Sequence, residues 1–132
     1  MTHAEIYSDA SYDAATNCAG WAYAVSMRGI RATRSGVLSK VTIQAAELHA
    51  ALAGVRHALA LGARSATLYI DNTGVIALIE GKAAADAALA AELDDLRQTI
   101  ALRCVWVRAH VRHGSSGNAH VDALARAALK QR

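Results

Sequence analysis

The sequence predicts a single α/β domain in which helices flank a five-stranded mixed sheet, with the elements in the order βββαβααβα. Three short extended segments separated by turn-forming residues precede the first long helical segment, which indicates antiparallel strands. After that helix, compact apolar strands alternate with helical segments, as in parallel strands joined by crossover helices. The chain has 132 residues and no internal repeat or low-complexity linker, so we expect one domain over residues 1–132.

The three N-terminal segments are each short and bounded by turn signals. Residues 4–11 (AEIYSDAS) have a β-rich centre and stop before turn-forming residues at 13–17. Residues 20–27 (GWAYAVSM) alternate small and large side chains, and Arg28-Gly29 separates them from residues 30–38 (IRATRSGVL). We expect these three strands to pair antiparallel.

A long helix follows. Thr42 is the predicted N-cap, the next residues up to Leu61 are helix formers, and Gly62 ends the helix. Its larger apolar side chains fall on one stripe, which consists of Leu48, Leu52, Val55 and Leu59.

The C-terminal half alternates strands and helices. Residues 65–71 (SATLYID) predict a buried strand, which is followed by a short helix through residues 75–80. Residues 84–102 predict an amphipathic helix, residues 104–110 (CVWVRAH) a fifth strand, and Asn118 to about Leu129 the last helix.

Composition narrows the class of protein. Fourteen Lys and Arg residues against eleven Asp and Glu residues give a net charge of +3 and a pI near 9.1, which suits a polyanionic partner. The two cysteines have no metal-binding spacing, and no secretory signal is present, so we expect free thiols and a cytoplasmic protein. Arg56 and His57 interrupt the longest apolar stretch, so we expect no membrane span; we further expect a monomer.

Four carboxylates lie in segments that otherwise read as buried strand or helix: Asp9, Glu47, Asp71 and Asp122. Acids are rarely buried without a compensating partner, and a pair of divalent cations is the obvious one. A right-handed crossover unit would place the strand that ends at Asp71 beside the first strand, which carries Asp9. Glu47 begins a row of small side chains at helical spacing, which suits close packing of the helix on the sheet.

Each acid also has an ordinary structural interpretation. Asp9 and Asp71 are compatible with turn positions, Glu47 with a capping box, and Asp122 with the dipole at the start of a helix. These interpretations must all hold independently, whereas one metal site explains the four acids together.

Four motifs in this order resemble ribonuclease H of type 1, from the first strand to the last helix. They are IYSDAS, TIQAAELHAAL, LYIDNTGVI, and VWVRAH followed by GNAHVDALARAA. The region between Gly81 and Arg103 contains no Trp- and Lys-rich basic protrusion, so the chain resembles the compact members of the family that lack it. Ala45 stands where some members place Arg, and the loop YDAATNCAG is poorer in Gly than is common in the family.

The resemblance implies the ribonuclease H-like fold and endonucleolytic hydrolysis of the RNA strand of RNA/DNA hybrids with two Mg²⁺ or Mn²⁺ ions. It implies that Asp9 bridges both metals, while Glu47, Asp71 and Asp122 complete the shells. His110 matches the family's loop histidine, which assists proton transfer or product release, and His113 is the alternative.

The resemblance also implies substrate contacts. Gln44 stands where the family reads the minor groove, and Thr42 where a hydroxyl holds a DNA phosphate. Asn72 and Asn118 are further candidates, with helix capping or a turn as the alternative role. Two other functions stay open: a catalytically silent hybrid-binding domain, and a two-metal nuclease of the same superfold that acts on DNA.

Overall fold

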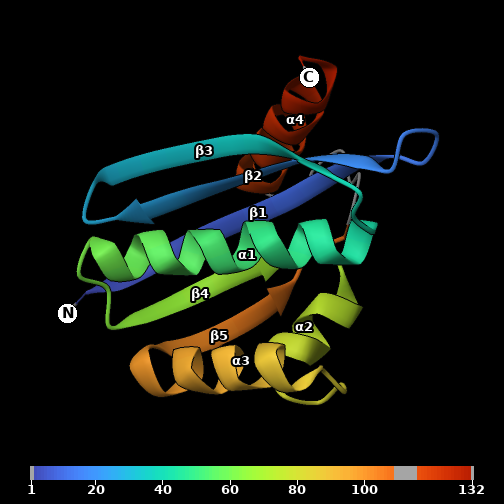
Figure 1. Ribbon diagram of the computed structural model, residues 1–132. Coiled ribbons are helices and arrows are strands. Elements are labelled where there is room, and N and C mark those ends of the chain that lie inside the picture. The colour runs from blue at the N-terminus through green and yellow to red at the C-terminus, as the bar shows by residue number, and fades with distance from the viewer. Residues whose placement is uncertain (1, 109–115, 132) are drawn as a thin grey trace.

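The computed structural model describes residues 2–108 and 116–131 and confirms the predicted α/β architecture and element order. One five-stranded sheet has the strand order β3-β2-β1-β4-β5 (Figure 1). The strands are β1 (His3–Asp13), β2 (Cys18–Met27), β3 (Ile30–Ser39), β4 (Ser65–Ile70) and β5 (Ala101–Trp106). The helices are α1 (Ile43–Ala60), α2 (Thr73–Ile79), α3 (Ala87–Thr99) and α4 (Ser116–Lys130). Within the described ranges, no helix is both long and apolar enough to cross a lipid bilayer.

The pairing of the strands is mixed, as the sequence predicts. β1 pairs antiparallel with β2, and β2 pairs antiparallel with β3. On its other side β1 pairs parallel with β4, and β4 pairs parallel with β5. The carboxyl ends of β1, β4 and β5 therefore lie at the same edge of the sheet.

Helices cover both faces of the sheet (Figure 1). On one face, α1 and α3 bury Leu52, Val55 and Leu93 against Ile6 and other strand residues in the main core. On the opposite face, α4 buries Val121 and Ala125 against Ala22 and Ala24 of β2. Side chains of β2 pack in both cores, because successive residues point to opposite faces of a strand.

The row of small residues on α1 lies close to the sheet, as predicted. Ala51 and Ala58 are fully buried, and a Cβ atom at Gly54 would lie 2.8 Å from Cγ2 of Ile6. This close approach carries Glu47, which is in the same row, toward the edge of the sheet where β1 and β4 end.

Gly20 has a comparable role on the other face. A Cβ atom at this position would lie 2.0 Å from the Ala125 carbonyl oxygen and 2.8 Å from the Leu129 backbone nitrogen of α4. Both contacts are to backbone, so only a shift of the helix could relieve them. Glycine at position 20 therefore sets how closely α4, which carries Asp122, packs on β2.

We expect Gly20→Ala to lower the free energy of unfolding by about 1–3 kcal/mol, the usual cost of overpacking a core. Gly74→Ala is the control, because a Cβ atom there would meet only the ends of the Gln44 and Asn72 side chains. Chemical denaturation of both variants measures the difference. Equal stability of the two variants would contradict the close packing of α4 on Gly20.

The predicted boundary between the second long helix and the fifth strand is wrong. Residues 84–102 were expected to be helical, but α3 covers Ala87–Thr99, and Ile100 is already extended. Asp86 caps α3 by accepting a hydrogen bond from the Leu89 N–H at 2.8 Å. β5 begins at Ala101 rather than at residue 104, because its first three residues already pair with β4. Pairing with a neighbouring strand here outweighs the helix propensity of the segment.

Candidate active site

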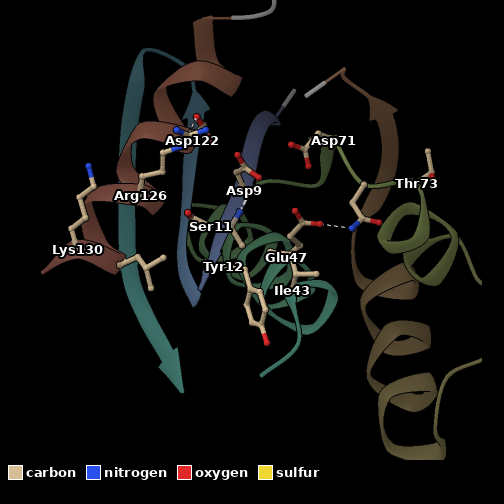
Figure 2. A pocket seen from close by; sticks show the side chains of 13 residues that line it. Asp9, Ser11, Tyr12, Ile43, Glu47, Asp71, Thr73, Asp122, Arg126 and Lys130 are labelled. Atoms are coloured by element: carbon tan, nitrogen blue, oxygen red, sulfur yellow. Dashed lines mark hydrogen bonds and ion pairs between the residues drawn. The ribbon is translucent and has the colours of Figure 1, made fainter. Parts of the chain in front are cut away.

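A cleft with a volume of about 710 Å³ opens where β1 and β4 end (Figure 2). Side chains from β1, α1 and α4, together with the segment after β4, line it. All four carboxylates singled out in the sequence are among the lining residues: Asp9, Glu47, Asp71 and Asp122. Acids as far apart in sequence as Asp9 and Asp122, which are 113 positions apart, thus share one cavity.

Asp9 lies within β1, not in a turn, and its side chain is only 5% exposed. Its Oδ1 accepts a hydrogen bond from the Ala10 N–H at 2.9 Å. Asp71 follows β4 directly. Since β1 and β4 are parallel and Tyr7 is opposite Tyr69, the two aspartates come next to each other at the strand ends.

Glu47 comes from α1 and is also buried, at 8% exposed. The Asn72 amide Nδ2 donates a hydrogen bond of 2.5 Å to Glu47 Oε2, while Asn72 Oδ1 accepts from the Val75 N–H at 3.1 Å. A capping-box role for Glu47 is therefore wrong. Asn72 caps α2 and at the same time orients the Glu47 carboxylate toward the cleft.

One carboxylate oxygen from each of Asp9, Glu47 and Asp71 lies within 4.8 Å of the others. Figure 2 shows these three side chains converging in the cleft. Three hard oxygen donors at this separation fit a magnesium or manganese ion. This acidic cluster has the ligand chemistry of a metal site, and its donors lie close to one another.

The electrostatics of the cluster also favour a bound cation. Burial raises the pKa of Asp9 to about 8, and the negative charges of Asp71 and the other two carboxylates add to the rise. The hydrogen bond from the Ala10 N–H opposes it. Burial, followed by the charge of Asp71, raises the pKa of Glu47 to about 7. A divalent ion would reverse this repulsion by supplying the positive charge that the cluster needs.

Without divalent ions we expect the protein to lose stability as the pH rises. The folded-state pKa of Asp9 is about 8 against an ordinary value of 3.8, so between these values the folded state binds more protons than the unfolded state. The resulting stabilisation is complete below about pH 4 and is lost as the pH rises through 8.

Thermal melting in the presence of a chelator, from pH 5 to pH 9, measures this loss. Asp9→Asn should flatten the curve, because Asn does not titrate. A variant that keeps the full pH dependence would show that other groups cause it.

Asp122 lines the cleft but lies outside the group of three oxygens within 4.8 Å. It is in the second turn of α4, and its Oδ2 lies 3.2 Å from Nε of Arg126 in an ion pair. The structure therefore brings three of the predicted ligands together and places the fourth at the same cavity, paired with a cation.

The other residues implied as substrate contacts occupy different positions. Thr42 is the N-cap of α1 and accepts a hydrogen bond from the Ala45 N–H at 3.1 Å. Gln44 is exposed, and its amide lies close to Gly74 at the start of α2. Asn118 lies inside α4 and is buried, and its Oδ1 has no hydrogen-bond partner among the described residues. His110 and His113 fall in residues 109–115, outside the described residues.

Two basic residues at the cleft were not identified from the sequence. Arg126 and Lys130 follow Asp122 at intervals of four and line the same cavity. This spacing, which puts residues on one face of a helix, was the signal that could have found them.

Comparison with known proteins agrees with the fold. The chain matches the RNase H family over residues 1–130. It belongs to the RNase H family. Members of this family are metal-dependent nucleases that bind RNA/DNA hybrids, and the compact form without a basic protrusion is consistent with the size of this domain. A direct sequence search of curated proteins finds no match.

Solved structures of RNase H domains share the fold at low sequence identity. The N-terminal RNase H domain of a Mycobacterium tuberculosis protein, solved as a fusion with maltose-binding protein, has a TM-score of 0.82 at 20% identity, over 99% of this chain and 96% of that one. RNase H1 from the halophilic archaeon Halobacterium salinarum NRC-1 has a TM-score of 0.79 at 19% identity, over 98% and 99%. An RNase H1 isolated from compost by a metagenomic approach has a TM-score of 0.78 at 16% identity, over 99% and 98%.

Proposed function

We propose that this RNase H domain hydrolyses the RNA strand of RNA/DNA hybrids endonucleolytically, with two Mg²⁺ or Mn²⁺ ions. The observation that carries the proposal is the acidic cluster: one oxygen each of Asp9, Glu47 and Asp71 lies within 4.8 Å of the others, at the edge of the sheet. A binding domain without catalysis has no need for three carboxylates held at a cost in a shared cavity.

The four carboxylates would together hold the two ions. Asp9, the most buried member of the cluster, would be a ligand of both ions, with Glu47 and Asp71 as further ligands. Asp122 would complete the set after leaving Arg126. When bound, the ions lower the pKa of a water that attacks the scissile phosphate and stabilise the leaving 3′ oxygen.

Other side chains support the ligands and the substrate. Asn72 acts as a positioning residue, because its amide holds Glu47. Gln44 and Thr42 lie at the exposed start of α1, where they would contact the minor groove and a DNA phosphate of the hybrid. Asn118 would be a further substrate contact, since its amide oxygen has no hydrogen-bond partner among the described residues.

Cleavage of a hybrid with a labelled RNA strand, with and without Mg²⁺, tests the proposal. Duplex DNA and single-stranded RNA of the same sequence are the comparison substrates. Cleavage of the RNA strand only in the hybrid is the expected result. Binding without cleavage would support a silent hybrid-binding domain, and cleavage of DNA alone would support a DNA nuclease of the same fold.

We also expect His110→Ala to slow turnover by about a hundredfold without loss of metal or hybrid binding, because a loop imidazole would assist proton movement. Single-turnover cleavage of the hybrid measures the rate, and His113→Ala is the matched control. A larger loss in the control would assign the role to His113.

A further inference from the structure

One face of α4 presents a row of charged side chains to the cleft. Asp122, Arg126 and Lys130 are spaced by four residues, and all three line the cavity that contains the acidic cluster (Figure 2). The rise of about 1.5 Å per residue separates successive members by about 6 Å along the helix axis. The row therefore leads from the carboxylates to two cations one helical turn apart.

Arg126 forms an ion pair with Asp122, which also lines the cleft. Its Nε lies 3.2 Å from Asp122 Oδ2 and 3.3 Å from Oδ1, and the two side chains are 53% and 29% exposed. Exposed pairs at this helical spacing contribute only about 0.3–0.5 kcal/mol. The phosphates of a nucleic-acid backbone, which form a dense row of negative charges, can therefore take the guanidinium from Asp122 at little cost.

Lys130 is exposed and forms no ion pair with the residues that the structure describes. The two basic residues between α2 and β5 form ion pairs with acids of the same region. Lys82 lies 3.3 Å from Glu80, and Arg97 pairs with Asp94. Neither Lys82 nor Arg97 is among the residues that line the cleft, whereas α4 places Arg126 and Lys130 at the cleft itself.

We propose that Arg126 and Lys130 bind backbone phosphates of the nucleic-acid substrate next to the acidic cluster, with Asp122 as the internal anion that holds Arg126 until a phosphate replaces it. This inference rests on the proposed function, since it assigns the substrate contacts of the same cleft. A guanidinium presents a planar fork of donors that matches phosphate oxygens, and an ammonium acts as a point charge. Release of Arg126 leaves the Asp122 carboxylate free to turn toward Asp9.

Binding of a labelled hybrid across a range of salt concentrations tests the inference. All variants carry Asp71→Asn to prevent cleavage, and no divalent ion is added. Arg126→Gln and Lys130→Ala should each lower the slope of log K against log salt by about 0.9, the value for one lost phosphate contact on a duplex. Arg64→Gln and Lys82→Ala are matched controls, because both residues are exposed and neither is among those that line the cleft.

The exchange at Arg126 has its own readout. Asp122→Asn should tighten hybrid binding more in a protein with Arg126 than in the Arg126→Gln background. The reason is that loss of the Asp122 charge frees the guanidinium for a phosphate only where Arg126 is present. Equal tightening in both backgrounds would refute the exchange.

The outcomes separate this inference from the proposed function. If the unmodified protein cleaves hybrids but the two α4 variants bind like the controls, the inference fails and the proposed function stands. If the unmodified protein cleaves no hybrid, but its binding of hybrid and of DNA duplex depends on Arg126 and Lys130, the proposed function fails and the phosphate-binding role of these two residues stands.

Discussion

Asp9→Asn should abolish hybrid cleavage, with a loss of about a thousandfold or more. A metal that acts on the reacting phosphate supplies several kcal/mol of transition-state stabilisation, and each 1.36 kcal/mol corresponds to about a factor of ten in rate. Asp9 is the most buried of the proposed ligands, at 5% exposed, and it has Asp71, Glu47 and Asp122 as charged neighbours. Asn keeps the shape of the side chain but lacks the negative charge that the ions need.

The same substitution should leave the fold intact or stabilise it when metal is absent. Burial and neighbouring charges raise the pKa of Asp9 to about 8, so ionising this group above that pH is unfavourable in the folded state. Removal of the charge relieves the repulsion. The variant should therefore melt at the same or a higher temperature than the unmodified protein at pH 8.5 in a chelator.

Asp95→Asn is the control for both measurements. Asp95 is an exposed acid on α3, and it is not among the residues that line the cleft. It should keep full cleavage and an unchanged melting temperature. Normal activity of the Asp9→Asn variant would contradict the assignment of Asp9 to the metal site. Unfolding of this variant would show that the Asp9 carboxylate is needed for the fold.

Addition of Mg²⁺ or Mn²⁺ should raise the melting temperature of the unmodified protein by several degrees. Ions that bind the folded cluster, and not the separated acids of an unfolded chain, stabilise by about 2.7 kcal/mol at a hundred times the dissociation constant. A stabilisation of 1 kcal/mol shifts the midpoint by about 2–8 °C for domains in this range of sizes. Relief of the repulsion among Asp9, Glu47 and Asp71 should make the rise larger at pH 8 than at pH 5.5.

An Asp9→Asn, Asp71→Asn double variant provides the comparison. It lacks two of the three oxygens that lie within 4.8 Å of one another, so most of the rise should disappear. Melting curves at constant ionic strength, followed by chelation to reverse the effect, measure specific binding. A rise of equal size in the double variant would place the ions elsewhere on the protein.

Local sequence signals determined most of the elements. The turn at Arg28-Gly29, the cap at Thr42 and the break at Gly62 each act over a few residues, so the strands before α1 and the bounds of α1 were predictable. The row of small residues that follows Glu47 also predicted how α1 approaches the sheet. Acids in otherwise apolar segments indicated a shared site for the same reason, because burial of a carboxylate is costly wherever it occurs.

Tertiary structure decided what depends on partners distant in sequence. Residues 100–102 have a helical pattern of their own, but pairing with β4 makes them extended. The hydrogen bond from Asn72 to Glu47, the contact of α4 with Gly20 and the pairing of Asp122 with Arg126 at the cleft likewise arise only when the elements pack. The sequence by itself determined which groups are present and which local structures they favour. The separation of three carboxylate oxygens by no more than 4.8 Å comes from strand register and helix packing, since these set the distances between groups that no local rule connects.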